Sequence, residues 1–198
     1  MELDPKQLSP RDSYRWLIDC VVPRPIAWIG TMNGDGVRNL APFSFFGGVT
    51  AAPPTVMASI GRRRGVRKDT SANLLASGEG VVHIPTRELA EAMVASSAEV
   101  EDTVDEFDLT GLATVAGSKV GAPRLVDAAI AMEVRVAQHL EIGAGPIDTF
   151  FLEIVHYHID DRVLVDGRID PARLAAVGRL GGAGYCDTAA PFDIARPG

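Results

Sequence analysis

Cysteine is scarce in this sequence, and its scarcity limits the redox chemistry that the chain can use. The two cysteines, Cys20 and Cys186, lie far apart and form neither a disulfide framework nor a CxxC pair. No apolar run reaches the roughly 18–20 residues that span a membrane. Residues 1–6 also lack the basic and then apolar layout of a signal peptide. These absences predict a cytoplasmic protein.

Positive charge is also in short supply, because the net charge is −7. A chain without a global basic field cannot hold a polyanion, which excludes general nucleic-acid binding. The positive charge that is present is concentrated, since five of the 19 basic residues fall within residues 62–68. An acidic protein with one basic segment suits the binding of one small anion.

The length of 198 residues is enough for one domain with a sizeable core and short for two. Hydrophobic residues make up 46% and charged residues 23%, which is typical of a globular chain. We therefore expect a single domain over residues 1–198, with a lead-in segment at 1–21 and a C-terminal tail at 178–198.

Most of the expected elements are strands that follow one another closely along the chain. Strands are expected at residues 26–31, 37–40, 55–60, 80–84, 130–136 and 149–160, and helices at 68–78 and 86–97. In the strand at 130–136, Ile130 and Met132 face one way and Glu133 the other. Strands adjacent in sequence and joined by turns predict a mainly β protein, an antiparallel barrel with peripheral helices.

The sequence lacks the usual catalytic motifs. It has no nucleophile elbow and no Cys–His signature, so the catalytic residues stay unknown. His156 and His158 alternate on one strand face, but no third ligand has a recognised spacing, so a satisfied histidine pair is favoured and no metal is expected. The carboxylates of residues 102–108 indicate a solvated loop. The glycine cluster at 179–185 lacks the strand–turn–helix context of a dinucleotide site.

One unusual segment is NLAPFSFFGG, at residues 39–48. Pro42 cannot donate a ladder hydrogen bond, and Gly47 with Gly48 leaves backbone without side-chain cover. Such a segment suits a place where main chain meets a flat, partly apolar ligand. From these residues alone, an irregular core strand with a bulge is the other interpretation.

The basic segment at residues 62–68 comes directly before a helix start. Asp69 or Thr70 can cap that helix, and Gly78 stands where a C-terminal glycine belongs. A helix N-terminus supplies N–H donors to an anion, and arginine side chains offer bidentate geometry to phosphate. The pattern GxxxxGK[ST] is absent, which argues against a nucleoside triphosphate. The segment predicts a monophosphate site, with a solvated basic loop as the alternative.

Several segments, taken in their order, resemble one family. They are residues 24–29 (RPIAWI), 39–46 (NLAPFSFF), 53–54 (PP), 68–70 (KDT) with Asn73, 105–107 (DEF), 156–161, and 179–182 (RLGG) with Tyr185. Together these are similar to the flavin reductase-like FMN-binding proteins that include flavoredoxin. The resemblance runs from about residue 22 to the C-terminal tail, and the NLAPFSFF block with KDT is its specific part.

The resemblance implies a split β-barrel homodimer that carries FMN. It implies that the isoalloxazine and ribityl portion is lined by Asn39, Leu40, Ala41, Pro42, Phe43 and Ser44. It implies that the ribityl phosphate is surrounded by Ser59, Arg62, Arg63, Lys68, Asp69 and Thr70. The two segments that the residues single out by themselves are the same two.

Members of this family divide between NAD(P)H:flavin oxidoreductases and electron carriers. The resemblance implies an oxidoreductase in which NADH or NADPH passes hydride to FMN, and a flavin or another small acceptor takes the electrons. A flavoredoxin-like electron carrier without pyridine nucleotide turnover is the alternative, and a non-catalytic flavin-binding barrel is a third reading.

Overall fold

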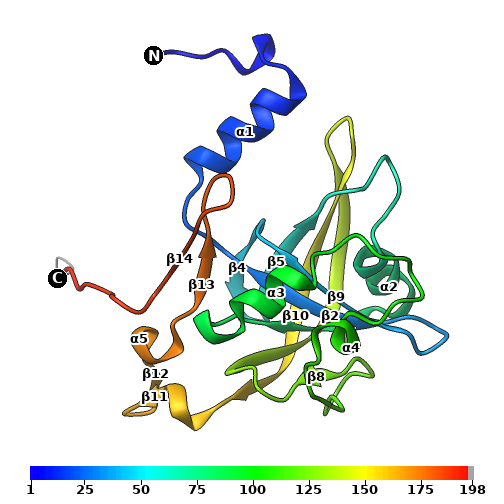
Figure 1. Cartoon of the computed structure of the whole chain (residues 1–198), viewed down its shortest axis with the longest axis vertical. Helices are drawn as coiled ribbons and strands as arrows, with labels where there is room; N and C mark the ends of the chain where they lie inside the picture. The colour runs from blue at the N-terminus through cyan, green and yellow to red at the C-terminus, as the bar shows by residue number, and fades with distance from the viewer. Residues whose placement is uncertain (196–198) are drawn as a thin grey trace.

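The architecture is built on a seven-stranded antiparallel sheet, seen in the computed structural model, which describes residues 1–195 (Figure 1). The strand order is β3-β2-β6-β9-β10-β5-β4. The strands are β2 (Ala27–Met32), β3 (Arg38–Phe43), β4 (Phe46–Ala51), β5 (Pro54–Ile60), β6 (Glu79–His83), β9 (Ile130–Ile142) and β10 (Ile147–Ile159). β3 and β4 are consecutive in the chain but stand at opposite edges of the sheet. The sheet therefore curls on itself and stays open between these two strands.

Smaller elements surround this sheet. Short strands are β1 (Arg24–Pro25), β7 (Thr114–Val115), β8 (Arg124–Leu125), β11 (Leu164–Val165), β12 (Arg168–Ile169), β13 (Val177–Arg179) and β14 (Tyr185–Asp187). The α-helices are α1 (Pro10–Cys20), α2 (Asp69–Ser77), α3 (Ala90–Ala95), α4 (Glu106–Thr110) and α5 (Pro171–Leu174). Three single 3-10 turns lie at Pro5–Gln7, Arg87–Leu89 and Asp161–Val163. The prediction of a mainly β fold with peripheral helices is confirmed. No helix among residues 1–195 is both long enough and apolar enough to span a membrane.

Both faces of β2 are buried, which explains why its sequence is apolar at every position except Thr31 instead of alternating. Ile29 points into the main core, together with Phe150 and Leu152 of β10. Trp28 points to the opposite face and packs in a second cluster with Met93 of α3 and Phe107 of α4. The Trp28 indole donates to Ser96 Oγ over 2.9 Å. The helices thus cover the outer face of the sheet at β2.

The segment at residues 39–48 divides between two strands. Its first half lies in β3, paired with β2 from Arg38 opposite Met32 to Phe43 opposite Ala27. Its second half begins β4, whose pairing with β5 shifts register between Gly48 and Thr50. The expected irregular strand with a bulge is therefore present in β4. Ligand binding at β3 is compatible with this bulge, because the bulge lies in β4, beyond the connection between β3 and β4.

Three local expectations from the sequence are corrected. Lys68, and not Asp69 or Thr70, is the N-cap residue of α2, while Gly78 closes the helix with φ +73° as expected. The helix expected at 86–97 is a 3-10 turn followed by the six-residue α3. The strand expected at 130–136 continues to Ile142 because it pairs with β10 along its length. Glu133, on the strand face opposite Ile130 and Met132, is fully buried.

The buried Glu133 carboxylate is satisfied by three donors. The backbone N–H groups of Ser118 and Lys119 lie 2.6 and 2.5 Å away, and His158 Nε2 donates over 2.6 Å. Burial raises the pKa of Glu133, but the hydrogen bonds from Ser118, His158 and Lys119 outweigh it and hold the pKa below its ordinary value. The loop at 116–122 is anchored to β9 through this group.

His83 is a fully buried histidine whose two ring nitrogens both form hydrogen bonds. Its Nδ1 lies 3.0 Å from the Trp28 carbonyl oxygen and donates to it, and its Nε2 accepts from the Leu125 N–H over 3.0 Å. A second proton on the ring would have to go to Nε2, and it would break the hydrogen bond from the Leu125 N–H. Burial accordingly lowers the pKa of His83 to about 4.

Acid is expected to destabilise the protein through His83. The unfolded chain takes up this proton near pH 6.5 and the folded chain only near pH 4, so stability falls as pH falls through that window. The loss by pH 5 is about 2 kcal/mol. Urea unfolding at pH 7, 6 and 5 measures it, and His83→Gln should flatten the slope between pH 6.5 and 5. An equal slope in that variant would assign the acid sensitivity to other groups.

Candidate functional site

A cavity of about 480 Å³ opens where β3, the basic loop at residues 61–68, the start of α2 and the segment at 96–106 meet. Its volume falls in the range of small-molecule sites, roughly 300–1,000 Å³. Its walls are Asn39, Ala41, Pro42, Arg63, Arg64, Val66, Arg67, Lys68, Asp69, Thr70, Ser96, Ser97, Ala98, Glu99, Val100, Glu101, Asp102 and Glu106. The two segments singled out in the sequence therefore meet at one cavity.

Asn39 forms one wall, and its amide orientation is fixed from both ends. Its Nδ2 donates to both Glu106 carboxylate oxygens, over 3.1 and 3.0 Å. Its Oδ1 accepts from Thr70 Oγ1 over 2.7 Å and from Thr31 Oγ1 over 3.4 Å. These bonds tie β3 to the first turn of α2. A buried amide held in this way is pre-organised and cannot rotate freely.

Glu106 is the buried anchor of this network. Besides the Asn39 amide it accepts the backbone N–H of Leu40 over 3.0 Å, and it is only 4% exposed. Burial raises the pKa of Glu106 above its ordinary value, and the hydrogen bonds from Leu40 and Asn39 oppose that rise. α4 positions the residue, because Asp105 caps this helix by accepting from the N–H groups of Phe107 and Asp108.

The N-terminus of α2 opens on the cavity without a side-chain cap. Lys68, the N-cap residue, is extended (φ −73°, ψ 157°), and its side chain makes no capping hydrogen bond to the helix backbone. The Lys68 ammonium lies 5.6 Å from the centroid of the Phe43 ring. Ser71 Oγ, in the first turn, is buried and has no partner among the described residues. Ser71 is fully buried and does not line the cavity, so the helix N–H groups and the Lys68 cation are the donors that fit an anionic group there.

The basic loop reaches this position through a tight turn. Arg63 and Val66 exchange two backbone hydrogen bonds of 2.8 Å each. Between them Arg64 and Gly65 have positive φ, at 51° and 84°. Glycine adopts this conformation without strain, which explains Gly65 at the second position of the turn. The turn places Arg64 and Lys68 on the same cavity.

Two arginines of the loop are committed to a buried carboxylate, Asp148 at the start of β10. Arg62 forms a bidentate pair with Asp148 over 3.1 and 3.0 Å, and Arg67 reaches it over 3.2 Å. His139 Nε2 also lies 3.0 Å from Asp148. Burial raises the pKa of Asp148, but the bonds from Arg62, His139 and Arg67 lower it to about 2. Arg62 and Arg67 also pair with Glu141.

The remaining loop cations differ in their partners. Arg63 pairs with Glu99, which belongs to the segment on the other side of the cavity. Arg64 and Lys68 form no ion pair among residues 1–195. The pKa of Asp69, which also lines the cavity, is raised by burial and by the nearby Asp102. The cavity lining thus carries charges of both signs. Its cations without a carboxylate partner in residues 1–195 are Arg64 and Lys68, which come just before α2.

The structure brings together seven of the twelve site residues expected from the sequence. Those that line the cavity are Asn39, Ala41, Pro42, Arg63, Lys68, Asp69 and Thr70. Leu40 and Phe43 belong to the two core clusters. Ser44 Oγ accepts from Arg24 over 3.3 Å, and Ser59 shares a 2.9 Å hydrogen bond with Thr149. The fifth expected residue that does not line the cavity is Arg62, whose side chain is bonded to Asp148.

Sequence reasoning missed Arg64, Glu106 and the wall at residues 96–102. The solvated loop expected at 102–108 is wrong for Glu106, which is buried because Asp105 starts a helix that turns it inward. A signal was present, since Asp105 directly before an apolar Phe107 has the layout of a capped helix. His158, by contrast, is satisfied by Glu133, and it packs edge-on against His156 with ring centroids 4.6 Å apart.

Comparison with known proteins agrees with this geometry. Residues 19–172 match a family described as flavin reductase like domain. An uncharacterized protein of Halalkalibacterium halodurans is 38% identical over an alignment that covers 100% of this chain and 97% of that protein. Nitrilotriacetate monooxygenase component B from Bacillus cereus superposes with a TM-score of 0.94 at 29% identity, covering 98% of each chain. A Shewanella frigidimarina protein with a split barrel domain has a TM-score of 0.84 at 23% identity, covering 100% of this chain and 98% of its own.

These matches confirm the resemblance that the sequence motifs carry. They confirm the split barrel as the fold and FMN as the cofactor of this kind of protein.

Proposed function

Because the chain belongs to the flavin reductase-like family, we propose that it is an FMN-dependent oxidoreductase that uses NADH or NADPH to reduce a flavin or another small acceptor. The observation that carries the proposal is the uncapped N-terminus of α2, which opens beside Lys68 on the same cavity as the Asn39 wall. One end of this cavity suits a phosphate, and the other suits a flat ring with a polar edge.

The residues present fit FMN. Lys68, Arg64 and the first N–H groups of α2 would hold the phosphate. Asn39, Ala41 and Pro42 would face the ribityl chain and the ring. Ser44, Ser59 and Arg62 are assigned a supporting role, since each is already bonded to a neighbouring strand or loop.

FMN supplies the redox chemistry when it is bound, by accepting a hydride and releasing electrons. The side chains of this chain position it. Glu106 and Thr70 hold the Asn39 amide in one orientation, so that wall does not reorganise when a ligand enters. Pro42 presents no N–H to the cavity, which leaves an apolar contact at that point. No side chain needs to transfer a proton for this role.

Anaerobic mixing with NADH or NADPH tests the activity. We expect the flavin absorbance of the FMN-loaded protein to bleach within seconds and to return when FMN or riboflavin is added as acceptor. Protein without FMN, mixed in the same way, is the control. A flavin that stays oxidised for minutes at millimolar pyridine nucleotide would exclude the reductase and leave the electron carrier. Failure to bind FMN at micromolar concentration would exclude both.

We further propose that the protein is a homodimer. α1 stands away from the sheet and buries none of its residues, although Tyr14 and Leu17 are apolar (Figure 1). The outer strand β4 is also mostly exposed from Val49 to Ala51. A second copy can cover such surfaces, and stable dimers of this kind bury more than about 2,000 Å² in total. Sedimentation should give twice the chain mass of 21.0 kDa, and a monomer that retains FMN would refute this assembly.

The cytoplasm stays the proposed compartment. Cys20 and Cys186 are both free, and free thiols are typical of a reducing compartment.

A further inference from the structure

A separate cavity, of about 240 Å³, lies where the 3-10 turn at Arg87–Leu89 meets α5 and the 3-10 turn at Asp161–Val163. Three arginines line it, Arg87, Arg162 and Arg173, against one carboxylate, that of Glu88. We call it the arginine cavity. It shares no residue with the cavity proposed for FMN. In a chain whose net charge is −7, three cations and one anion give this lining an excess of positive charge.

Backbone hydrogen bonds fix the segments that form the walls of the arginine cavity. The Arg87 N–H donates to the Ala175 carbonyl over 3.0 Å, and the Asp160 N–H donates to the Ala129 carbonyl over 2.9 Å. A third bond, of 2.9 Å, ties the residue before α5 to the turn at Asp161–Val163. The cavity therefore belongs to the folded backbone and is formed before any ligand enters.

The three guanidinium groups keep most of their donors available. Arg87 and Arg173 form no ion pair among residues 1–195, and Arg162 reaches Asp160 only over 3.4 Å. Arg162 and Arg173 each donate to one backbone carbonyl, over 2.7 and 3.1 Å. A guanidinium has five N–H donors, so these bonds fix the direction of two side chains and leave donors for an anion.

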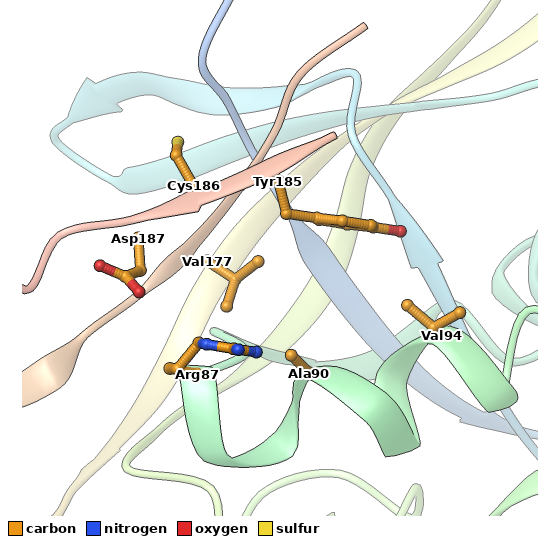
Figure 2. Close-up of a pocket in the computed structure, with 7 residues that line it drawn as sticks. All are labelled: Arg87, Ala90, Val94, Val177, Tyr185, Cys186 and Asp187. Carbon is orange, nitrogen blue, oxygen red and sulfur yellow. The ribbon is translucent and has the colours of Figure 1, made fainter. Parts of the chain in front are cut away.

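Arg87 also borders a neighbouring cavity, between α3 and the β13–β14 hairpin. Figure 2 shows that cavity, with the Arg87 side chain extending toward Ala90. Asp187, labelled in the same view, forms no ion pair with Arg87 in the part of the chain that the structure describes. Arg173 lines the arginine cavity and not its neighbour, so a substitution of Arg173 is the more specific test.

Thr86 adds a polar group that has no partner inside the protein. The residue lines the arginine cavity and is only 5% exposed, and its Oγ1 makes no hydrogen bond among residues 1–195. It precedes the turn at Arg87–Leu89, but its side chain does not cap that turn. A buried hydroxyl without a partner is unfavourable, and a ligand oxygen at this wall would relieve that cost.

The rest of the lining is aliphatic. It consists of Ala129, Val163, Leu174 and Ala175, and it contains no aromatic side chain. A bare inorganic ion would leave these side chains without an apolar contact, whereas an organic acid would cover them. Arginine binds a carboxylate in bidentate geometry. The volume is below the roughly 300–1,000 Å³ of drug-sized ligands, so the acid must be compact.

We propose that the arginine cavity binds a small aliphatic carboxylate. The charged group lies against Arg87, Arg162 and Arg173, and the Thr86 hydroxyl donates to it. The hydrocarbon body covers the aliphatic side chains of the lining. This site is independent of the proposed function, since no residue is common to the two cavities.

Saturation-transfer NMR with cyclohexanecarboxylate on the full-length, FMN-loaded chain tests the site. Cyclohexylmethanol, which has the same ring without the charge, is expected to bind about tenfold more weakly. Arg173→Gln should weaken the binding of the acid about three- to tenfold. Arg168→Gln is the matched control, because Arg168 is an exposed arginine of β12 that does not line the cavity. Its affinity for the acid should not change.

Thr86→Val separates binding from a structural role. Valine has nearly the shape of threonine without the hydroxyl, so the affinity for the acid should fall about two- to fivefold. Urea unfolding without the acid should show no loss of stability, because this hydroxyl has no partner to lose. A loss of stability with unchanged affinity would make Thr86 a structural residue and contradict the site.

Three further results would overturn the proposal. They are unchanged affinity in Arg173→Gln, equal binding of cyclohexylmethanol and the acid, and displacement of the acid by NADPH at matched concentration. The last would assign the arginines to a nucleotide phosphate. A failure of FMN binding would be seen separately, in the flavin absorbance of the same sample, and would leave the arginine cavity untouched.

Discussion

Lys68→Ala is expected to weaken FMN binding by about ten- to a hundredfold, because a charge-assisted hydrogen bond to phosphate contributes roughly 1.5–3 kcal/mol. Lys68 is the N-cap residue of α2 and has no carboxylate partner in residues 1–195, so its charge is available to a ligand. Riboflavin carries no phosphate and should bind the variant and the parent protein almost equally. Fluorescence titration of the FMN-free protein with each flavin measures the difference.

Lys119→Ala is the matched control for this titration, since Lys119 is an exposed lysine outside the cavity. Its FMN affinity should not change. Equal losses of FMN and riboflavin affinity in Lys68→Ala would show that Lys68 supports the fold through its contact with Phe43 and not the phosphate.

Asp148→Ala is expected to lower the free energy of unfolding by about 3–5 kcal/mol, the usual effect of removing one partner from a buried ion cluster. Asp148 is fully buried, and it is the common acceptor of Arg62, Arg67 and His139. Its removal leaves the donors of three side chains without their shared carboxylate. Urea unfolding at pH 7 measures the loss.

The neighbouring carboxylate provides the comparison. Glu141 pairs with the same two arginines but is 45% exposed, and exposed pairs contribute about 0–1 kcal/mol. Glu141→Ala should therefore cost far less than Asp148→Ala. Similar losses in the two variants would contradict the assignment of Asp148 as the centre of the cluster.

The places of β2, β3, β5 and α2 along the chain could be predicted because their signals are local. The turn residues between β2 and β3, the β-branched run in β5 and the Gly78 stop are readable from a few neighbours. The length of β9 could not be predicted, since residues 137–142 mix polar and apolar side chains and are mostly exposed, and they form a strand because β10 pairs with them. Single-domain organisation over residues 1–198 stays a prediction.

The site was predicted in outline and not in detail. Sequence position places Lys68 and Thr70 at a helix start, and the role proposed for Lys68 follows from that position. The positions of the Arg62 and Arg67 side chains depend on Asp148, which lies more than 80 residues away in sequence. Glu106 is likewise brought to Asn39 by the packing of α4. Long-range pairing of this kind has no local signature.

The pairing of the basic loop also limits how far its electric field extends. Three carboxylates, of Glu99, Glu141 and Asp148, pair with three of the five cations of residues 62–68, and a fourth, of Asp69, lines the same cavity. At physiological salt an exposed charge is screened within about 8 Å, and a nearly balanced group acts over less. The loop therefore does not draw polyanions toward the protein from a distance. It recognises a phosphate only after the ligand has reached the start of α2, so selection there occurs by contact.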